Sequence, residues 1–312
     1  MDDMHQVSIE DRAAMKILIT GANGQLGREL SEILESGAAE IGKIDSIYDN
    51  AEVMGVDLPD YDLTDEKVVE SLFGKFKPDL VFNCAAYTNV DGCEKNEEVA
   101  MSGNATLPGV VAEFCARGGS RIVHISTDYV FSGDEPGERV ESDNAIPKSA
   151  YGRTKQIGEM LVRRNCVQSH VVRTSWLFGK YGKNFVETML NLAGLREEIS
   201  VVDDQIGNPT SANDLAYEMT KIASSDDFGI WHCTGNGICS WADFAEKSIS
   251  LAGLSCKVNR ISTEQYKLQN PNAADRPKYS ALKNEKLQNT IGDEMRNWHE
   301  SLVDYIKNRK AS

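Results

Sequence analysis

The chain has 312 residues, of which 41% are apolar and 26% charged, and its formal net charge is −15. This composition is ordinary for a soluble globular protein, and the length suffices for one large α/β domain or two smaller ones. So acidic a surface repels nucleic acid and anionic lipid, and no apolar run is long enough to cross a bilayer, so neither nucleic acid nor a membrane is an expected partner.

The first half of the chain alternates short β-branched runs with helical patterns. Residues 1–14 are polar and acidic, and we expect a flexible extension and not a secretory signal. Strands are expected at 16–20, 53–56, 80–83, 121–126 and 171–174, and helices at 25–36, 67–76, 108–117 and 151–164, with a further helical segment before Asn104. The alternation predicts a Rossmann-type doubly wound parallel sheet within an α/β fold, with ligands at the carboxyl ends of the strands.

After residue 175 the pattern loosens. Helices are expected at 185–193, 213–223, 241–252 and 293–307, and one more strand at 230–233. We therefore expect a nucleotide-binding domain over 15–175, completed by part of 205–235. The remainder of 176–312 would form a smaller, discontinuous substrate-binding lobe.

A glycine-rich turn, Gly21-Ala22-Asn23-Gly24-Gln25-Leu26-Gly27, separates the first strand from the first helix. The three glycines would permit the tight turn, the approach of a pyrophosphate to the backbone and close packing of helix on strand. The pyrophosphate would meet the positive end of the helix dipole. This context favours dinucleotide binding over an ordinary βα turn.

A dinucleotide site also uses an acidic residue after the second strand, whose carboxylate accepts hydrogen bonds from the hydroxyls of the adenosine ribose. Asp45 is closer to the usual spacing of about 20 residues, whereas Asp57 follows the better strand. We prefer Asp57 and treat the intervening stretch as an insertion. Asp45 remains an alternative, and either aspartate could instead be a solvated surface residue without a ligand. No Arg or Lys adjoins Asp57 in the sequence, which slightly favours NADH over NADPH.

Tyr151 and Lys155 are four residues apart on an expected helix, so their side chains share a face. An ammonium beside the phenol would lower the pKa of the tyrosine, and the pair could then protonate a carbonyl oxygen while hydride reaches the carbon. Thr127, at the end of the strand 121–126, could donate to the same oxygen. Tyr129 is a rival acid, but it lacks a lysine four residues later.

Several longer fragments add to these groups: TGANGQLG at 20–27, DLTD at 62–65, NCAAYTNVDGCE at 83–94, STDYVF at 126–131, YGRTK at 151–155, RTSWLFG at 173–179, DDQIGNPT at 203–210 and RPKYSAL at 276–282. Together they resemble the extended short-chain dehydrogenases/reductases, and more narrowly the dTDP-4-dehydrorhamnose reductase family. The resemblance runs from Met15 through nearly all of the fold. STDYVF with RTSW and DQxGxPT is more specific than the Tyr-Lys pair.

The resemblance implies NADH or NADPH as cofactor and a dTDP-sugar as substrate. The reaction would be reduction of the C4 ketone of dTDP-4-dehydro-β-L-rhamnose to dTDP-L-rhamnose, a step in cell-surface polysaccharide biosynthesis. It implies cofactor contacts at Gly21, Gly24, Gln25, Leu26, Gly27, Asp57, Asp62, Leu63, Ala86, Tyr87, Thr88, Tyr151 and Lys155. It also implies catalysis by Tyr151, Lys155 and Thr127, and substrate contacts at Thr127, Asp128, Trp176 and Arg276.

Two alternatives remain at this stage. A related nucleotide-sugar epimerase or dehydratase would keep its cofactor bound, but dehydratases usually carry an Asp-Glu pair where Asp128 is followed by Tyr129. The second alternative is a non-catalytic regulatory subunit that binds a dinucleotide. The intact set of Tyr151, Lys155 and Thr127 argues against it, since such a subunit would not need these residues.

The resemblance and the composition bear on assembly and location as well. Some members of the family are thought to dimerise through metal-bound carboxylates, but Asn213 stands where one is expected, so no metal is predicted. Monomer and homodimer both stay open. The seven scattered cysteines, without a CxxC pair, suit a reducing cytoplasm.

Overall fold

The structure is a computed structural model that describes residues 14–311. The extension expected at 1–14 therefore lies outside the described residues, apart from Ala14 at its end. Within the described range, no helix combines the length and the apolar composition needed to span a bilayer.

A six-stranded parallel sheet forms the centre of the molecule. Its strands are β1 (Lys16–Thr20), β4 (Glu52–Val56), β5 (Leu80–Asn83), β6 (Arg121–Thr127), β7 (Ser169–Thr174) and β12 (Gly229–His232), in the order β12-β7-β6-β5-β1-β4. The predicted Rossmann-type fold is thus confirmed. Because β4 and β5 pair with opposite sides of β1, the winding reverses there. Open α/β sheets bind ligands at such a reversal, beyond the carboxyl ends of the strands.

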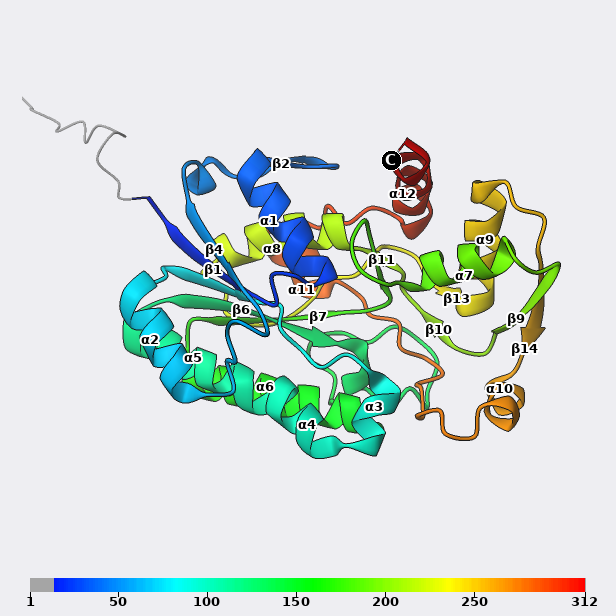
Figure 1. The fold of residues 1–312 in the computed structure, drawn as a ribbon, viewed down its shortest axis with the longest axis horizontal. Coiled ribbons are helices and arrows are strands. Elements are labelled where there is room, and N and C mark those ends of the chain that lie inside the picture. Colours follow the sequence, from blue (N-terminus) through cyan, green and yellow to red (C-terminus); the bar gives the residue numbers. More distant parts are fainter. Residues whose placement is uncertain (1–13, 312) are drawn as a thin grey trace, which may run out of the picture.

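Helices cover both faces of this sheet (Figure 1). One face carries α1 (Gln25–Ser36), α8 (Ala212–Ser224) and α11 (Glu285–Thr290), and the other carries α2 (Glu66–Phe76), α5 (Leu107–Gly118) and α6 (Ala150–Asn165). The strands are apolar on both sides, as Ile17, Leu18 and Ile19 show, because each face is buried under helices. On α1, the residues Leu26 and Leu30 lie one turn apart and supply part of its buried face.

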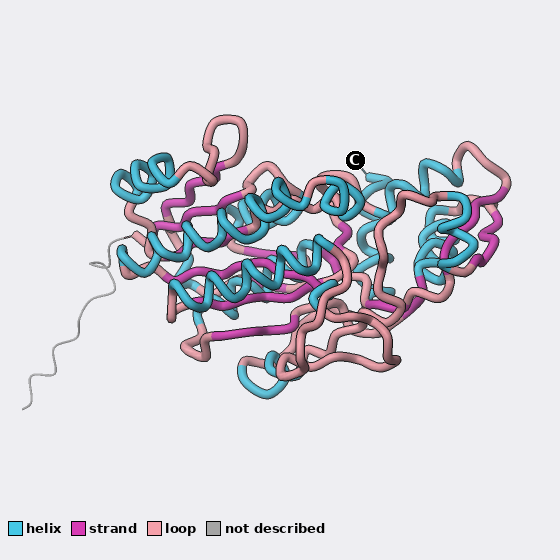
Figure 2. The backbone as a smooth tube through the Cα atoms, turned by 90° about the horizontal axis from the view of Figure 1, so that it is seen from below, coloured by secondary structure: helices cyan, strands magenta, loops and turns pink. Residues whose placement is uncertain are grey.

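The second lobe lies at one end of the sheet in both views (Figures 1 and 2). Its helices are α7 (Phe185–Ala193), α9 (Trp241–Ala252), α10 (Thr263–Gln269) and α12 (Trp298–Ala311). Three strand pairs join them: β8 (Leu177–Phe178) with β11 (Thr210–Ser211), β10 (Ile206–Gly207) with β13 (Cys239–Ser240), and β9 (Glu198–Val202) with β14 (Lys257–Ile261). The exact boundaries between the two lobes stay a prediction.

Some short elements were not expected. The stretch interpreted as an insertion forms a hairpin, β2 (Ala38–Ala39) and β3 (Gly42–Lys43), and a 3₁₀ turn, η2 (Ser46–Tyr48). After β5, α4 (Glu97–Met101) corresponds to the helical segment expected before Asn104. The elements α3 (Val90–Lys95), a π-helical turn, η3 (Ser102–Thr106), and a 3₁₀ turn at the end of β6, η4 (Asp128–Val130), were not expected. The expected helix 293–307 was wrong at its start, because the residues before Trp298 are tied to α8: Glu294 N donates to Glu218 and Arg296 pairs with Asp214.

Candidate functional site

The glycine turn joins β1 to α1 at the point of reversal. Gly21 has a φ of 66°, and a Cβ there would lie 2.7 Å from the backbone nitrogen of Ala85. A Cβ on Gly27 would lie 2.3 Å from the carbonyl oxygen of Gly21, so both positions require glycine. Gly24 caps α1 without a side-chain hydrogen bond from the described residues. The first amides of α1 are therefore suited to an anion.

Asp57 lies directly beside this turn. Its carboxylate accepts hydrogen bonds from the backbone nitrogens of Asn23 at 2.9 Å and Leu58 at 2.8 Å. Asp45 instead caps the η2 turn by accepting from Ile47 N, and it precedes β4, at the amino end of that strand. The geometry therefore favours Asp57 over Asp45 at the carboxyl edge, while contact with a ribose remains a proposal.

Two other residues expected near the adenosine differ in exposure, since Asp62 is exposed and Leu63 is buried. Asp62 accepts from the backbone nitrogen and the hydroxyl of Thr64, and these bonds hold the pKa of the Asp62 carboxyl below its usual value. Leu63 is 4% exposed and packs in the core beside α2. Leu63 can therefore offer little more than its backbone to a ligand.

The segment Ala86-Tyr87-Thr88 follows β5 at the same edge and is fixed by Asn104. The Asn104 amide accepts from Tyr87 N at 2.8 Å and donates to Tyr87 O at 3.1 Å. It also donates to Thr154 Oγ1 on α6 at 3.2 Å. Asn104 is fully buried in the η3 turn, and its role was not predicted from the sequence. The one available signal was a polar residue between two expected helices.

Thr127, Asp128 and Tyr151 come together where β6 ends. Thr127 Oγ1 donates to Asp128 Oδ1 at 2.9 Å. Burial raises the pKa of Asp128 to about 6. Burial and the nearby Asp128 carboxylate also raise the pKa of Tyr151, and a hydrogen bond to Thr127 offsets part of that rise. A phenol with a raised pKa stays protonated near neutral pH, but it is a weaker acid than an ordinary tyrosine, so it can release its proton only to a strongly basic oxygen such as the one that forms as hydride arrives.

Lys155 lies one turn further along α6 and is 1% exposed. Its Nζ donates to the carbonyl oxygen of Ile125 at 2.6 Å. Burial lowers the pKa of Lys155 to about 8, against the opposing influence of Glu159 and Cys84. The groups that shift the pKa of Tyr151 do not include Lys155. The predicted lowering of the phenol pKa by the ammonium was therefore wrong for the protein without ligands.

Some of the buried polar atoms without a partner belong to segments that reach this edge, whereas His170 Nε2 and Glu218 Oε2 lie elsewhere in the described chain. Within the described residues the former include Gln25 Nε2 at the start of α1, His124 Nε2 on β6, Asp128 Oδ2 after β6 and Thr174 Oγ1 at the end of β7. The backbone pairing sets Thr174 opposite Thr127. Because unpaired buried polar groups are costly, such atoms are typical of a surface that a polar ligand completes.

Trp176 and Arg276 come from the second lobe. Trp176 follows β7, and its ring stacks on Trp241 with centroids 3.5 Å apart. Arg276 Nη2 lies 3.3 Å from both carboxylate oxygens of Asp91 on α3. The positive charge of Arg276 acts on Tyr129, which in turn packs edge-on against the ring of Tyr151. Asp91 was not identified from the sequence, since its partner is far away in the chain.

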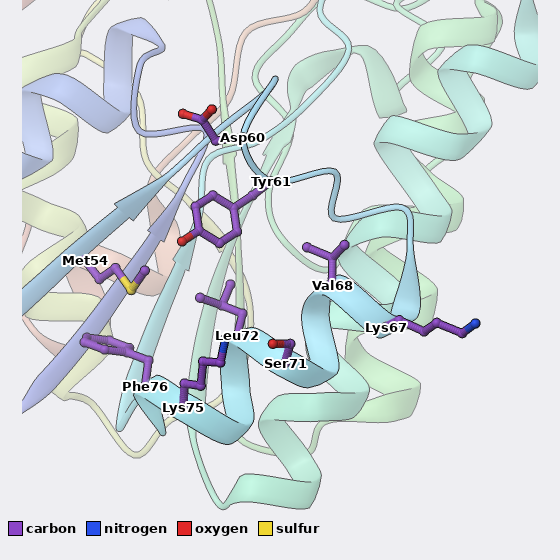
Figure 3. A pocket seen from close by; sticks show the side chains of 9 residues that line it. All are labelled: Met54, Asp60, Tyr61, Lys67, Val68, Ser71, Leu72, Lys75 and Phe76. Atoms are coloured by element: carbon purple, nitrogen blue, oxygen red, sulfur yellow. The ribbon is translucent and has the colours of Figure 1, made fainter.

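A cavity of about 430 Å³ lies between β4, the residues that follow this strand and α2 (Figure 3). Met54, Tyr61, Leu72 and Phe76 form much of its apolar lining. None of the residues expected to bind or react lines this cavity. It therefore does not compete with the carboxyl edge as the candidate site.

The described part of the chain holds no group of three or more His, Cys, Asp or Glu side chains that could bind a metal ion. Asn213 donates to Glu29 at 3.2 Å and accepts from Glu40 N at 2.8 Å. The predicted absence of a metal stays a prediction.

Comparisons with known proteins agree on one family. The sequence profile of the RmlD substrate binding domain matches residues 15–311. The spore coat polysaccharide biosynthesis protein SpsK of Bacillus subtilis (strain 168) is 38% identical over 297 residues, which are 95% of this chain and 99% of that protein.

Two solved structures are similar along the whole fold. A dTDP-4-dehydrorhamnose reductase from Clostridium acetobutylicum has a TM-score of 0.88 and 44% identity, covering 95% of this chain and 100% of that one. A dTDP-4-dehydrorhamnose reductase from Bacillus anthracis, solved in complex with NADP, has a TM-score of 0.87 and 37% identity at the same coverage.

Proposed function

The chain belongs to the RmlD substrate-binding-domain family, and on this premise we propose that it is an NAD(P)H-dependent reductase. It converts the C4 ketone of dTDP-4-dehydro-β-L-rhamnose to dTDP-L-rhamnose. The two reductase structures support this substrate. The observation that carries the proposal is the grouping of Tyr151, Thr127 and Lys155 at the sheet edge that also holds the glycine turn.

The residues of this edge fit a dinucleotide. Gly21 and Gly27 leave no room for a side chain between turn and sheet, and the amides that open α1 receive the pyrophosphate. Asp57 accepts from the adenosine ribose, Asp62 and Leu63 flank the adenosine, and the segment 86–88 lines the remaining path. When bound, the cofactor supplies a hydride to the sugar carbonyl carbon. The relative bound to NADP supports NAD(P)H, and the slight preference for NADH stays a prediction.

The protein then supplies the proton. Tyr151 donates its phenolic proton to the sugar O4 as the carbon receives hydride, so that the ketone becomes an alcohol. Thr127 orients the phenol, and the Lys155 ammonium holds the hydroxyls of the nicotinamide ribose. Asp128 and Trp176 contact the sugar or its nucleotide, and the Arg276 guanidinium holds the diphosphate.

The proposal extends to the location and the oligomeric state of the protein. The described cysteines are all free thiols, which supports a cytoplasmic location. The protein acts as a monomer or a homodimer, and light scattering of the purified protein distinguishes the two.

The test is an assay of the purified protein with NADH and NADPH against a panel of nucleotide-linked 4-keto sugars. We expect the absorbance of the reduced nicotinamide to fall with the dTDP-4-keto sugar, and NMR to identify a 4-hydroxyl product with the L-rhamno configuration. Product formed without added reductant, together with co-purified NAD⁺, would instead identify an epimerase or dehydratase. Bound dinucleotide without turnover of any sugar would identify a non-catalytic subunit.

A further inference from the structure

A buried ion pair lies one helical turn beyond Lys155 and has no part in the reaction described so far. Glu159 on α6 and Arg173 on β7 have side chains only 4% and 3% exposed. Arg173 Nε and Nη2 donate to the two carboxylate oxygens of Glu159 at 2.9 and 2.8 Å. Ser126 Oγ donates a further hydrogen bond to Glu159 at 2.5 Å. The carboxylate is thus desolvated and held in one orientation.

The same two elements hold this carboxylate and Lys155. Glu159 follows Lys155 by four residues on α6, so the two side chains share a face of the helix. Ser126, which binds Glu159, is the neighbour of Ile125, whose carbonyl oxygen accepts from Lys155 Nζ at 2.6 Å. The position of the carboxylate relative to the ammonium is therefore fixed through both α6 and β6.

Burial of an ammonium favours the neutral amine, so something must oppose it if Lys155 is to stay charged. The titratable and charged groups around it are Glu159 and Tyr151 on α6, Cys84 after β5, His124 on β6 and Arg173 on β7. The pKa of His124 is lowered far enough by burial that this imidazole is neutral. Burial raises the pKa of Cys84 to about 12, so its thiol is neutral as well.

Glu159 and Cys84 are the groups of the described chain that oppose the effect of burial on Lys155. Since the thiol is neutral near neutral pH, the negative charge that stabilises the ammonium comes from Glu159. Arg173 does not appear among the groups that shift the pKa of Lys155.

We propose that Glu159 is a positioning residue whose carboxylate, held by Arg173 and Ser126, keeps the buried Lys155 in its charged form. The catalytic consequence rests on the proposed function: Glu159 sets the upper pH limit of the reductase. The competing interpretation is an ion pair that only joins α6 to β7.

The first experiment does not depend on any substrate. NMR of the full chain labelled with ¹⁵N-lysine follows the titration of each Nζ, and the Lys155→Met spectrum identifies the Lys155 signal. We expect this signal to titrate near pH 8 in the unmodified protein. In Glu159→Gln it should titrate lower by roughly one pH unit or more. An unchanged titration in the folded variant overturns the proposal.

The second experiment uses the reductase reaction. In Glu159→Gln the alkaline limb of the pH profile of kcat should move down by the same interval as the Lys155 titration, with much of the activity retained at low pH. Asp214→Asn is the matched control, since Asp214 is 1% exposed and pairs with Arg296 at 2.6 Å away from Lys155. Its alkaline limb should stay in place. A uniform loss of activity in Glu159→Gln, without a displaced limb, means a purely structural role.

The two proposals can fail separately. If the unmodified protein reduces no 4-keto sugar but the Lys155 titration still moves, the proposed function falls and the positioning role stands. If Glu159→Gln does not fold because Arg173 loses its partner, the double variant Glu159→Gln/Arg173→Gln removes both buried charges. Its Lys155 signal must also titrate lower, and an unchanged titration there overturns the positioning role.

Discussion

Asp128 is a buried residue whose charge is costly to the fold. Burial raises its pKa from 3.8 to about 6, so the stability that the protonated carboxyl contributes is full below pH 4 and is lost as the pH rises through 6. Asp128→Asn never ionises. We expect the variant to be more stable than the unmodified protein at pH 8, by up to about 3 kcal/mol, with the difference shrinking toward pH 4. Urea unfolding at pH 5 and pH 8 measures this, and a variant less stable at pH 8 would contradict it.

Some single residues of the site could be predicted from local spacing in the sequence. Others could not, because their partners are distant in the chain. The glycine turn and the Tyr151–Lys155 pair were readable because each lies within a few neighbouring residues. Asn104 and Asp91 bind partners that only the folded chain brings near. The direction of the Tyr151 pKa shift depends on burial, which spacing does not reveal.

Among the elements, α1 depends on close contact with the glycine turn, whereas α2 contains a glycine with free space around it. A Cβ on Gly27 would meet the Gly21 carbonyl oxygen at 2.3 Å, but a Cβ on Gly74 would meet nothing within 4 Å. We expect Gly27→Ala to destabilise the protein by about 1–3 kcal/mol and to weaken dinucleotide binding. Gly74→Ala, the matched control, should stabilise it by about 0.5–1 kcal/mol. Thermal unfolding and cofactor titration test both, and equal effects of the two substitutions would be incompatible with this packing.

The elements of the central sheet were predicted well because parallel strands buried on both faces are continuous apolar runs. The two-residue strands of the second lobe, such as β8 and β10, have too few residues to show a period. The start of α12 could not be predicted for a different reason. Glu294 and Arg296 bond to α8, and these contacts between distant residues keep the segment before Trp298 out of the helix.

For the molecule as a whole, Arg276 links the second lobe to α3 through Asp91. If this arginine binds the substrate diphosphate, Arg276→Gln should raise KM for the nucleotide sugar roughly tenfold, because one charge-assisted contact is lost. The value of kcat should change by less than about threefold, since the diphosphate is remote from the reacting carbonyl. Steady-state kinetics test this. Arg260→Gln is the control, because Arg260 pairs with Asp203, Asp243 and Glu246 instead. Equal changes in KM for both variants would remove Arg276 from the substrate site.

The division into a nucleotide-binding half and a smaller lobe was expected from the loss of βα alternation after residue 175. In the structure, separate apolar clusters fill the two faces of the sheet and the second lobe. The way the lobes meet could not be predicted, because it depends on contacts such as Arg276 with Asp91 and the backbone nitrogen of Lys180 with Glu29, between distant parts of the chain.

The central claim is that Tyr151 gives the proton that accompanies hydride transfer. Stopped-flow measurement of reduced nicotinamide oxidation in Tyr151→Phe, beside a fluorescence titration of cofactor binding, tests it most directly. We predict that turnover falls by roughly 10²–10⁴ while the Kd of the cofactor changes by less than about twofold. Full activity in the phenylalanine variant would contradict the account.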